Sequence, residues 1–196
     1  MRKFALFISA ISNPLFISIP FSYFLVLRTS GDPAYSLAWT IISMSFAGLV
    51  GLFVLSGVKR GFFSDYDVTK REERPPLFAF TGIITVLYFI AIFILNGPKI
   101  LLVSLGALLF AILLAEIINT KIKASMHMAV FSSLSLVLII LYGGAFWLLL
   151  LFAPVVAWSR LRLKRHTPRE IVAGTILGIT IVFAIYLVVK YIILVK

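Results

Sequence analysis

The chain has 196 residues, is 62% hydrophobic and carries a formal net charge of +11. Its mean hydropathy of +1.13 is far above that of a soluble domain, and apolar runs of about 20 residues follow one another with few charges. This pattern predicts an all-α, polytopic transmembrane helical bundle of about six to seven spans. It excludes a transmembrane barrel, whose strands would alternate in polarity. Cysteine is absent, so neither a disulfide framework nor a thiolate metal site is expected.

Seven apolar segments are predicted to span the membrane. In chain order they cover residues 4–27, 36–57, 77–96, 99–119, 126–142, 145–159 and 168–195. The first begins like a signal peptide but shows no clear cleavage site, so an uncleaved helix is expected and a signal segment is the alternative. The sixth is short and contains Pro154, which favours a kink or burial among its neighbours. No stretch has room for a soluble domain, so one membrane domain is expected over residues 1–196.

The loops after the second, fourth and sixth predicted spans carry Arg74, His127 and His166. Even numbers of crossings separate these loops, so all three should emerge on one face of the membrane. Of the 18 Lys and Arg residues, 14 fall on this face and 4 on the other. Without the four cations that have a candidate phosphate role, the ratio is still 10 to 4. The positive-inside rule therefore predicts the cytoplasmic side for this face.

The loop before the last span holds the most informative residues. Ser159-Arg160, His166 and Glu170 place an arginine, a histidine and a carboxylate beside the start of an apolar helix. Residues 167–170 have the form of a capping box, which gives Glu170 and His166 a structural interpretation. In the functional interpretation, the helix N-terminus forms an anion site. Glu170 then holds the His166 ring in the tautomer whose other nitrogen can attack phosphorus.

In the loop before the fifth span, Lys123, Ser125 and His127 alternate. The structural interpretation is a helix through residue 142, N-capped by Ser125 and flanked by positive-inside lysines. However, a histidine beside a lysine at a span entrance also fits a general acid.

The loop over residues 59–76 is densely charged with both signs and is typical of a solvated connection. Pro75 and Pro76 would begin the next helix and fix Arg74 at its N-terminus. Arg71 would share a face with Arg74 if this stretch were helical. Arginine suits a bidentate grip on phosphate, so both residues are candidate phosphate ligands.

Together, these loops resemble the type 2 phosphatidic acid phosphatase (PAP2) superfamily of membrane lipid phosphatases. The motifs of that family are Lys-x6-Arg-Pro, Pro-Ser-Gly-His and Ser-Arg-x5-His-x3-Asp. The third is matched at Ser159, Arg160 and His166, with Glu170 in place of aspartate. The second is matched at Ser125 and His127, with Ala124 and Met126 in place of proline and glycine. The first keeps Arg74-Pro75, but Asp67 stands in place of lysine.

The resemblance implies a PAP2-like core and a phosphatase that works without a metal or another cofactor. His166 would be the nucleophile that forms a phosphohistidine, Glu170 its orienting partner, and His127 the acid for the leaving oxygen. The phosphate would be held by Arg74, Arg160 and Ser125, with Arg71 or Lys123 replacing the missing lysine.

The expected substrate is a lipid phosphomonoester or diphosphate, such as phosphatidate, phosphatidylglycerol phosphate or a polyprenyl (di)phosphate. The expected partners are this lipid phosphate and the bilayer, and no nucleic acid. Two alternatives stay open: a lipid phosphotransferase, and a catalytically silent protein that binds or transports a lipid phosphate.

Overall fold

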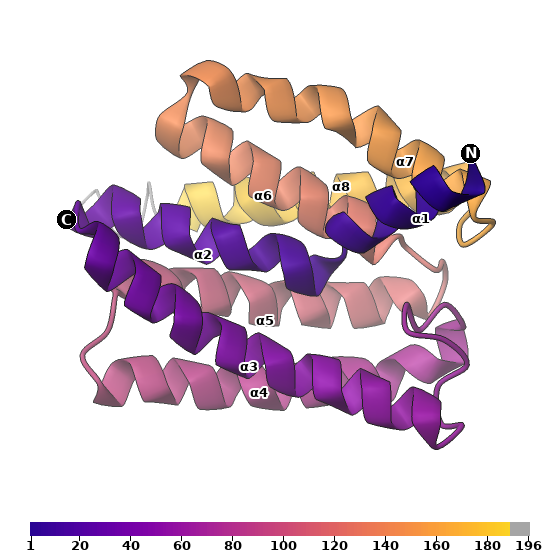
Figure 1. Cartoon of the computed structure of the whole chain (residues 1–196), viewed down its shortest axis with the longest axis horizontal. Coiled ribbons are helices and arrows are strands. Elements are labelled where there is room, and N and C mark those ends of the chain that lie inside the picture. Colours follow the sequence, from indigo (N-terminus) through magenta and orange to yellow (C-terminus); the bar gives the residue numbers. More distant parts are fainter. Residues whose placement is uncertain (189–196) are drawn as a thin grey trace. The chain divides into compact units, whose positions relative to one another are not determined.

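The computed structural model describes residues 1–188, and the regular secondary structure in this range is entirely helical. The elements are α1 (Arg2–Ile11), α2 (Pro14–Ser30), α3 (Pro33–Lys59), the 3-10 turn η1 (Arg71–Glu73), α4 (Arg74–Ile94), α5 (Lys99–Asn119), α6 (Met126–Tyr142), the 3-10 segment η2 (Gly144–Phe152), α7 (Ala153–Arg162) and α8 (Pro168–Val188) (Figure 1). The predicted all-α class is confirmed for the described part of the chain.

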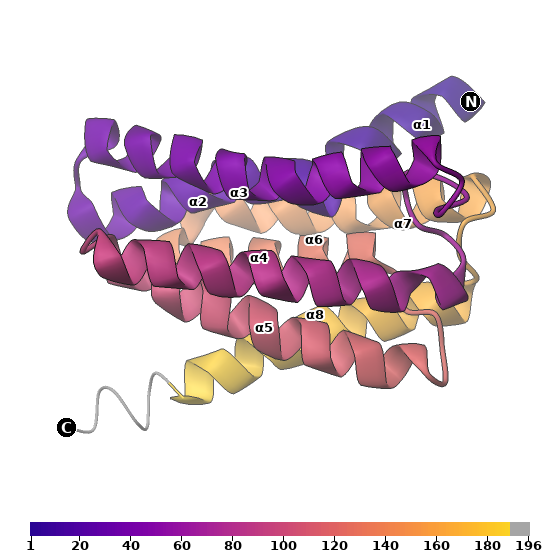
Figure 2. The ribbon, with the colours of Figure 1, turned by 90° about the horizontal axis from the view of Figure 1, so that it is seen from below.

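Five of these segments are long and apolar enough to cross a membrane: α3, η1 with α4, α5, η2 with α7, and α8. A sixth candidate is the pair α1 and α2, which is bent by 44° (Figure 2). The apolar helix α6 is shorter, with 17 residues. Each predicted span overlaps one of these segments, but only five of them, or six with the bent pair, are long and apolar enough to cross a membrane. Residues 189–195 of the last predicted span lie outside the described residues. The set fits a multi-pass membrane protein.

Turn-forming residues lie at two of the helix ends. Asp32 caps α3, because its Oδ1 accepts hydrogen bonds from the backbone N–H groups of Ala34 at 2.9 Å and Tyr35 at 3.1 Å. Gly143, between α6 and η2, and Gly144, the first residue of η2, have φ values of 61° and 50°, a region that glycine enters without a steric penalty. These boundaries are therefore set by local sequence.

The sixth predicted span differs from its expectation. Its first half, η2, has 9 residues in 3-10 conformation, and α7 adds 10 residues in α conformation. Because a 3-10 helix rises about 2.0 Å per residue against 1.5 Å for an α-helix, the two together reach roughly 33 Å, enough for the hydrocarbon core. Pro154 lies in the first turn of α7, where its missing N–H removes no helical hydrogen bond. The proline starts a helix and does not kink one.

The chain divides into two compact units. Unit 1 comprises Met1–Ile17 and Thr120–Lys196, and unit 2 comprises Ser18–Asn119. In unit 1, α8 packs along α6, α1 packs on α7, and η2 and α7 both contact α6. A core of Met128, Phe131, Val156 and Ile171 joins these helices. The single membrane domain expected from the sequence stays a prediction.

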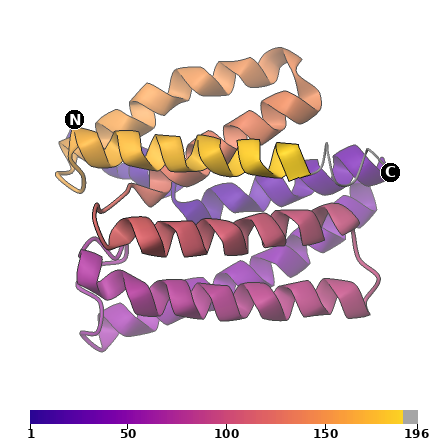
Figure 3. The same cartoon turned by 180° about the vertical axis from the view of Figure 1, so that it is seen from behind.

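In unit 2, α4 contacts both α3 and α5, and Figures 1 and 3 show α4 and α5 side by side. Val54, Phe63 and Val68 form a small core beneath the polar loop between α3 and η1. Within the helices, the Ser43 hydroxyl and the Tyr88 hydroxyl lie 2.7 Å apart, which joins α3 to α4 through a partly buried hydrogen bond. The charged loop is thus an ordered part of unit 2.

Two glycines on α8 allow its close approach to α6. A Cβ atom at Gly174 would lie 2.3 Å from the carbonyl oxygen of Ser125, and one at Gly178 would lie 2.3 Å from that of Ala129. Both neighbours are backbone atoms, so neither can rotate away. Small residues four positions apart are a common means of bringing membrane helices into backbone contact. Here the glycines fix how α6 and α8 are aligned, and the predicted site residues Ser125, His127, His166 and Glu170 lie around the starts of these two helices.

Candidate active site

The N-terminus of α8 forms the predicted capping box. The backbone N–H of Thr167 donates to Glu170 Oε2 at 3.2 Å, and the backbone N–H of Glu170 donates to Thr167 Oγ1 at 3.4 Å. Pro168 is the first residue of the helix. The two reciprocal bonds satisfy donors that a helix N-terminus would otherwise leave without partners.

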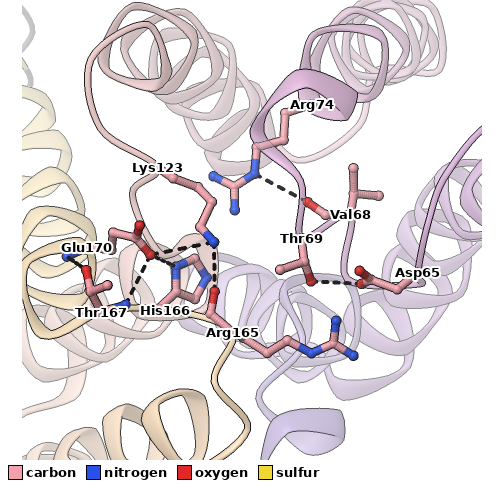
Figure 4. Close-up of polar contacts among 9 residues, drawn as sticks. All are labelled: Asp65, Val68, Thr69, Arg74, Lys123, Arg165, His166, Thr167 and Glu170. Atoms are coloured by element: carbon pink, nitrogen blue, oxygen red, sulfur yellow. Dashed lines mark hydrogen bonds and ion pairs between the residues drawn. The ribbon is translucent and has the colours of Figure 1, made fainter.

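The same Glu170 oxygen holds the His166 ring. His166 Nδ1 lies 2.9 Å from Glu170 Oε2, and the imidazole is 2% exposed (Figure 4). A carboxylate can only accept, so Nδ1 carries the proton, and the lone pair of the neutral ring lies on Nε2. The contact expected between Glu170 and His166 is therefore confirmed. One carboxylate both caps the helix and orients the ring, so the two interpretations are compatible.

Lys123 connects the loop before α6 to this cluster. Its Nζ donates to the carbonyl oxygen of Arg165 at 2.9 Å and lies 3.7 Å from Glu170 Oε2. Figure 4 shows Lys123, Arg165 and Glu170 around the His166 ring. A pocket of about 350 Å³ is lined by Lys123, Leu161, Lys164, Arg165, His166, Thr167, Pro168 and Glu170. With three cationic side chains against one carboxylate, this pocket suits an anion.

Ser125 ties the start of α6 to the start of α8. Its backbone N–H donates to the carbonyl oxygen of Glu170 at 3.0 Å, so the second and third predicted loops lie at the same end of unit 1. Ser125 occupies the N-cap position of α6, as predicted, but its hydroxyl makes no capping hydrogen bond. Within residues 1–188 this fully buried hydroxyl has no hydrogen-bond partner. A buried hydroxyl without a partner costs about 1–3 kcal/mol, which a ligand could recover.

His127 and Arg160 both contact Ser9 of α1. His127 Nε2 lies 3.2 Å from the Ser9 carbonyl oxygen, and Arg160 Nη1 donates to the Ser9 hydroxyl. His127 is 4% exposed and Arg160 is 1% exposed. Sequence reasoning assigned no site residue to α1 and missed Ser9. The available signal was weak: Ala5, Ser9 and Ser12 are small residues at helical spacing in a run of large apolar ones.

The two remaining predicted residues, Arg71 and Arg74, belong to unit 2. The 3-10 turn makes this stretch helical, but Arg71 is exposed whereas Arg74 is 3% exposed. Arg74 Nε donates to the carbonyl oxygen of Val68 at 3.4 Å, and Asn119 Nδ2 donates to the carbonyl oxygen of Arg71 at 3.3 Å. Figure 4 also draws the Arg74 bond. That all eight residues form one site remains a prediction.

The described residues contain no group of three or more His, Cys, Asp or Glu side chains that could hold a metal ion. No protein-family model matches the chain, and neither a curated protein nor a solved structure matches it. The resemblance to the PAP2 superfamily thus rests on the motif residues themselves.

Proposed function

We propose that this chain is an integral-membrane lipid phosphatase of the PAP2 type that hydrolyses a lipid phosphomonoester or diphosphate. The observation that carries the proposal is the pairing of His166 with Glu170 at the N-terminus of α8, in a pocket with Lys123. An oriented imidazole beside cations and a helix N-terminus is the arrangement that phosphoryl transfer to nitrogen needs.

The reaction has two steps in this proposal. First, the Nε2 lone pair of His166 attacks phosphorus, an N–P bond forms, and the P–O bond to the lipid breaks. The His127 ring, protonated on both nitrogens, gives a proton to the departing oxygen and becomes neutral. Second, water attacks the phosphohistidine, the N–P bond breaks, and His127 takes up the proton that water loses. The products are inorganic phosphate and the lipid alcohol, or the lipid monophosphate if the substrate is a diphosphate.

A lipid substrate is supported by the apolar surroundings of the pocket. Pro168 lines the His166 pocket and also begins an apolar groove of about 380 Å³ along α8. Val172, Ala173 and Ile176 continue this groove. A phosphate in the pocket would therefore have its hydrocarbon tail next to an apolar helix face. The cations near the phosphate and the apolar groove beyond it favour an amphipathic substrate over a soluble phosphate ester.

The experiment is a phosphate-release assay with the purified protein in detergent. Phosphatidate, phosphatidylglycerol phosphate and a polyprenyl diphosphate are the substrates, with and without a chelator. We expect release from at least one of them with the chelator present. Consumption of the lipid phosphate only with an added alcohol, with the phosphoryl group recovered on that alcohol and not as inorganic phosphate, would indicate a phosphotransferase. Binding of all three without release by the folded protein would overturn the proposal and favour a silent binding protein.

Replacing Glu170 with glutamine is expected to lower turnover by roughly 10²- to 10⁴-fold with little change in thermal stability. Glutamine can still accept from the Thr167 N–H, but it is neutral and no longer imposes a proton on Nδ1 of His166. Thr167→Ala is the matched control, since it breaks the other half of the capping box. That change should cost about 1 kcal/mol of stability and leave most turnover. Wild-type turnover in Glu170→Gln would remove Glu170 from the catalytic group.

The cation bias predicts that the motif loops face the cytoplasm. Single cysteines at Ser64, which is exposed between α3 and η1, and at Lys196, outside the described residues, test this in a chain without cysteine. In intact cells, a membrane-impermeant maleimide should label Lys196→Cys, whereas Ser64→Cys should need permeabilisation. The reverse pattern would mean that the cations serve phosphate binding and not orientation. Labelling of both would mean that the predicted number of spans is wrong.

A further inference from the structure

Ser9 lies at the centre of a buried polar cluster that joins three distant parts of unit 1. It is 6% exposed and faces inward from α1 next to Ala5, which is 0% exposed. Its carbonyl oxygen contacts His127 Nε2 on α6, and its hydroxyl accepts from Arg160 Nη1 on α7. One residue of α1 thus touches both the predicted general acid and a predicted phosphate ligand.

The carbonyl oxygen of Ser9 can accept a hydrogen bond from another helix because α1 ends two residues further along, at Ile11. The helix stops at Ile11, and the backbone N–H of Asn13 donates to the carbonyl oxygen of Ala10 at 3.1 Å. Pro14 has no N–H and starts α2, so the break follows from the sequence. The last carbonyls of a helix need partners from outside it, and His127 supplies one here. A carbonyl can only accept, so Nε2 of His127 keeps its proton, and the ring can give a second proton only from Nδ1.

We propose that Ser9 is a positioning residue of this site. Its carbonyl fixes the ring orientation of His127, and its hydroxyl fixes the guanidinium of Arg160. This inference rests on the proposed function. Because Ser9 holds Nε2 of His127, the proton that His127 exchanges with the leaving oxygen passes through Nδ1. Because Ser9 uses one of the five N–H donors of Arg160, the guanidinium is aimed before substrate binds, and less ordering is needed on binding.

The two faces of α1 differ in side-chain size and exposure, which fits a helix packed on α7 on one side and facing lipid on the other. Phe4, Phe7 and Ile11 are exposed on one face of α1, whereas Ala5 and Ser9 are buried on the other. In a bilayer the large apolar side chains would contact lipid, while Ala5 and Ser9 allow close packing on α7. The segment that looks like a simple N-terminal anchor therefore reaches the site.

The test compares Ser9→Ala with Ser9→Thr and Ser12→Ala. Ser9→Ala removes the hydroxyl that Arg160 contacts and keeps the carbonyl, so KM for a lipid phosphate should rise roughly 10-fold, with a smaller change in kcat. The Kd of orthovanadate, a phosphate mimic, should rise in parallel. Ser9→Thr restores a hydroxyl and should recover most of the loss. Ser12 is equally buried, and its hydroxyl donates to the Ile8 carbonyl at 2.7 Å and lies 3.5 Å from the Ser9 carbonyl oxygen. Ser12→Ala keeps both the carbonyl and the hydroxyl of Ser9, so it should behave like wild type.

The outcomes separate this inference from the proposed function. If the wild type neither hydrolyses lipid phosphates nor binds orthovanadate, the proposed function fails and the role of Ser9 falls with it. If the wild type does both and Ser9→Ala matches it in KM and Kd, only the positioning role is overturned. Equal losses in Ser9→Ala and Ser12→Ala, without recovery in Ser9→Thr, would also overturn it, because packing of α1 would then be the cause. Gel filtration of each variant checks that it is folded.

Discussion

Replacing His166 with alanine is expected to lower turnover by roughly 10⁴-fold or more on every phosphate ester, because the attacking atom is lost. Replacing His127 should have an effect that depends on the leaving group. Protonation matters most when the departing oxygen is a strong base, so a lipid phosphate should lose roughly 10²- to 10⁴-fold. An aryl phosphate, whose leaving group has a low pKa, should lose much less.

Both variants should be assayed side by side on an aryl phosphate and a lipid phosphate. The contact between His127 and the Ser9 carbonyl complicates the second variant, because alanine leaves that carbonyl without its donor. His127→Gln is the better test, since glutamine can still donate an N–H but cannot transfer a proton. Near-normal activity of His166→Ala would rule out the phosphohistidine. Equal losses on both substrates in His127→Gln would rule out the acid role.

Replacing Gly174 with alanine is expected to destabilise the protein by about 1–3 kcal/mol and to remove most activity. The added Cβ would lie 2.3 Å from the Ser125 carbonyl oxygen and 3.0 Å from its nitrogen. Because these are backbone atoms, α6 and α8 must move apart. The hydrogen bond from Ser125 to the Glu170 carbonyl would then be lost. His127, two residues further along, would shift relative to His166.

Thermal unfolding in detergent and phosphate release from the folded fraction measure this effect. Gly106→Ala in α5 is the matched control, because a Cβ there has nothing within 4 Å. Its helix should be unchanged or gain about 0.5–1 kcal/mol from the lower flexibility of alanine. If Gly174→Ala unfolds at the wild-type temperature with full turnover, the close approach of the two helices does not matter for the site.

Features that depend on near neighbours in the chain could be predicted from the amino-acid sequence. The length of the apolar runs indicated membrane helices, because hydrocarbon thickness sets a minimum helix length. Turn residues marked the helix ends, as at Asp32. The capping box of Thr167 and Glu170 was also predictable, because in this motif the glutamate side chain turns back toward the residues that precede the helix, among them His166.

Contacts between residues that are far apart in the chain could not be predicted and are known from the packing of the helices. Nothing in the local pattern relates Ser9 to His127 or to Arg160, more than a hundred positions away, and the long 3-10 segment η2 has no simple sequence signal either. Lys123 reaches the Arg165 carbonyl because Gly174 lets α6 and α8 approach closely. Such contacts depend on packing between helices, which residue spacing along one helix does not encode. The break at Pro14 is visible in the sequence, but the structure shows that His127 uses the carbonyl it leaves open.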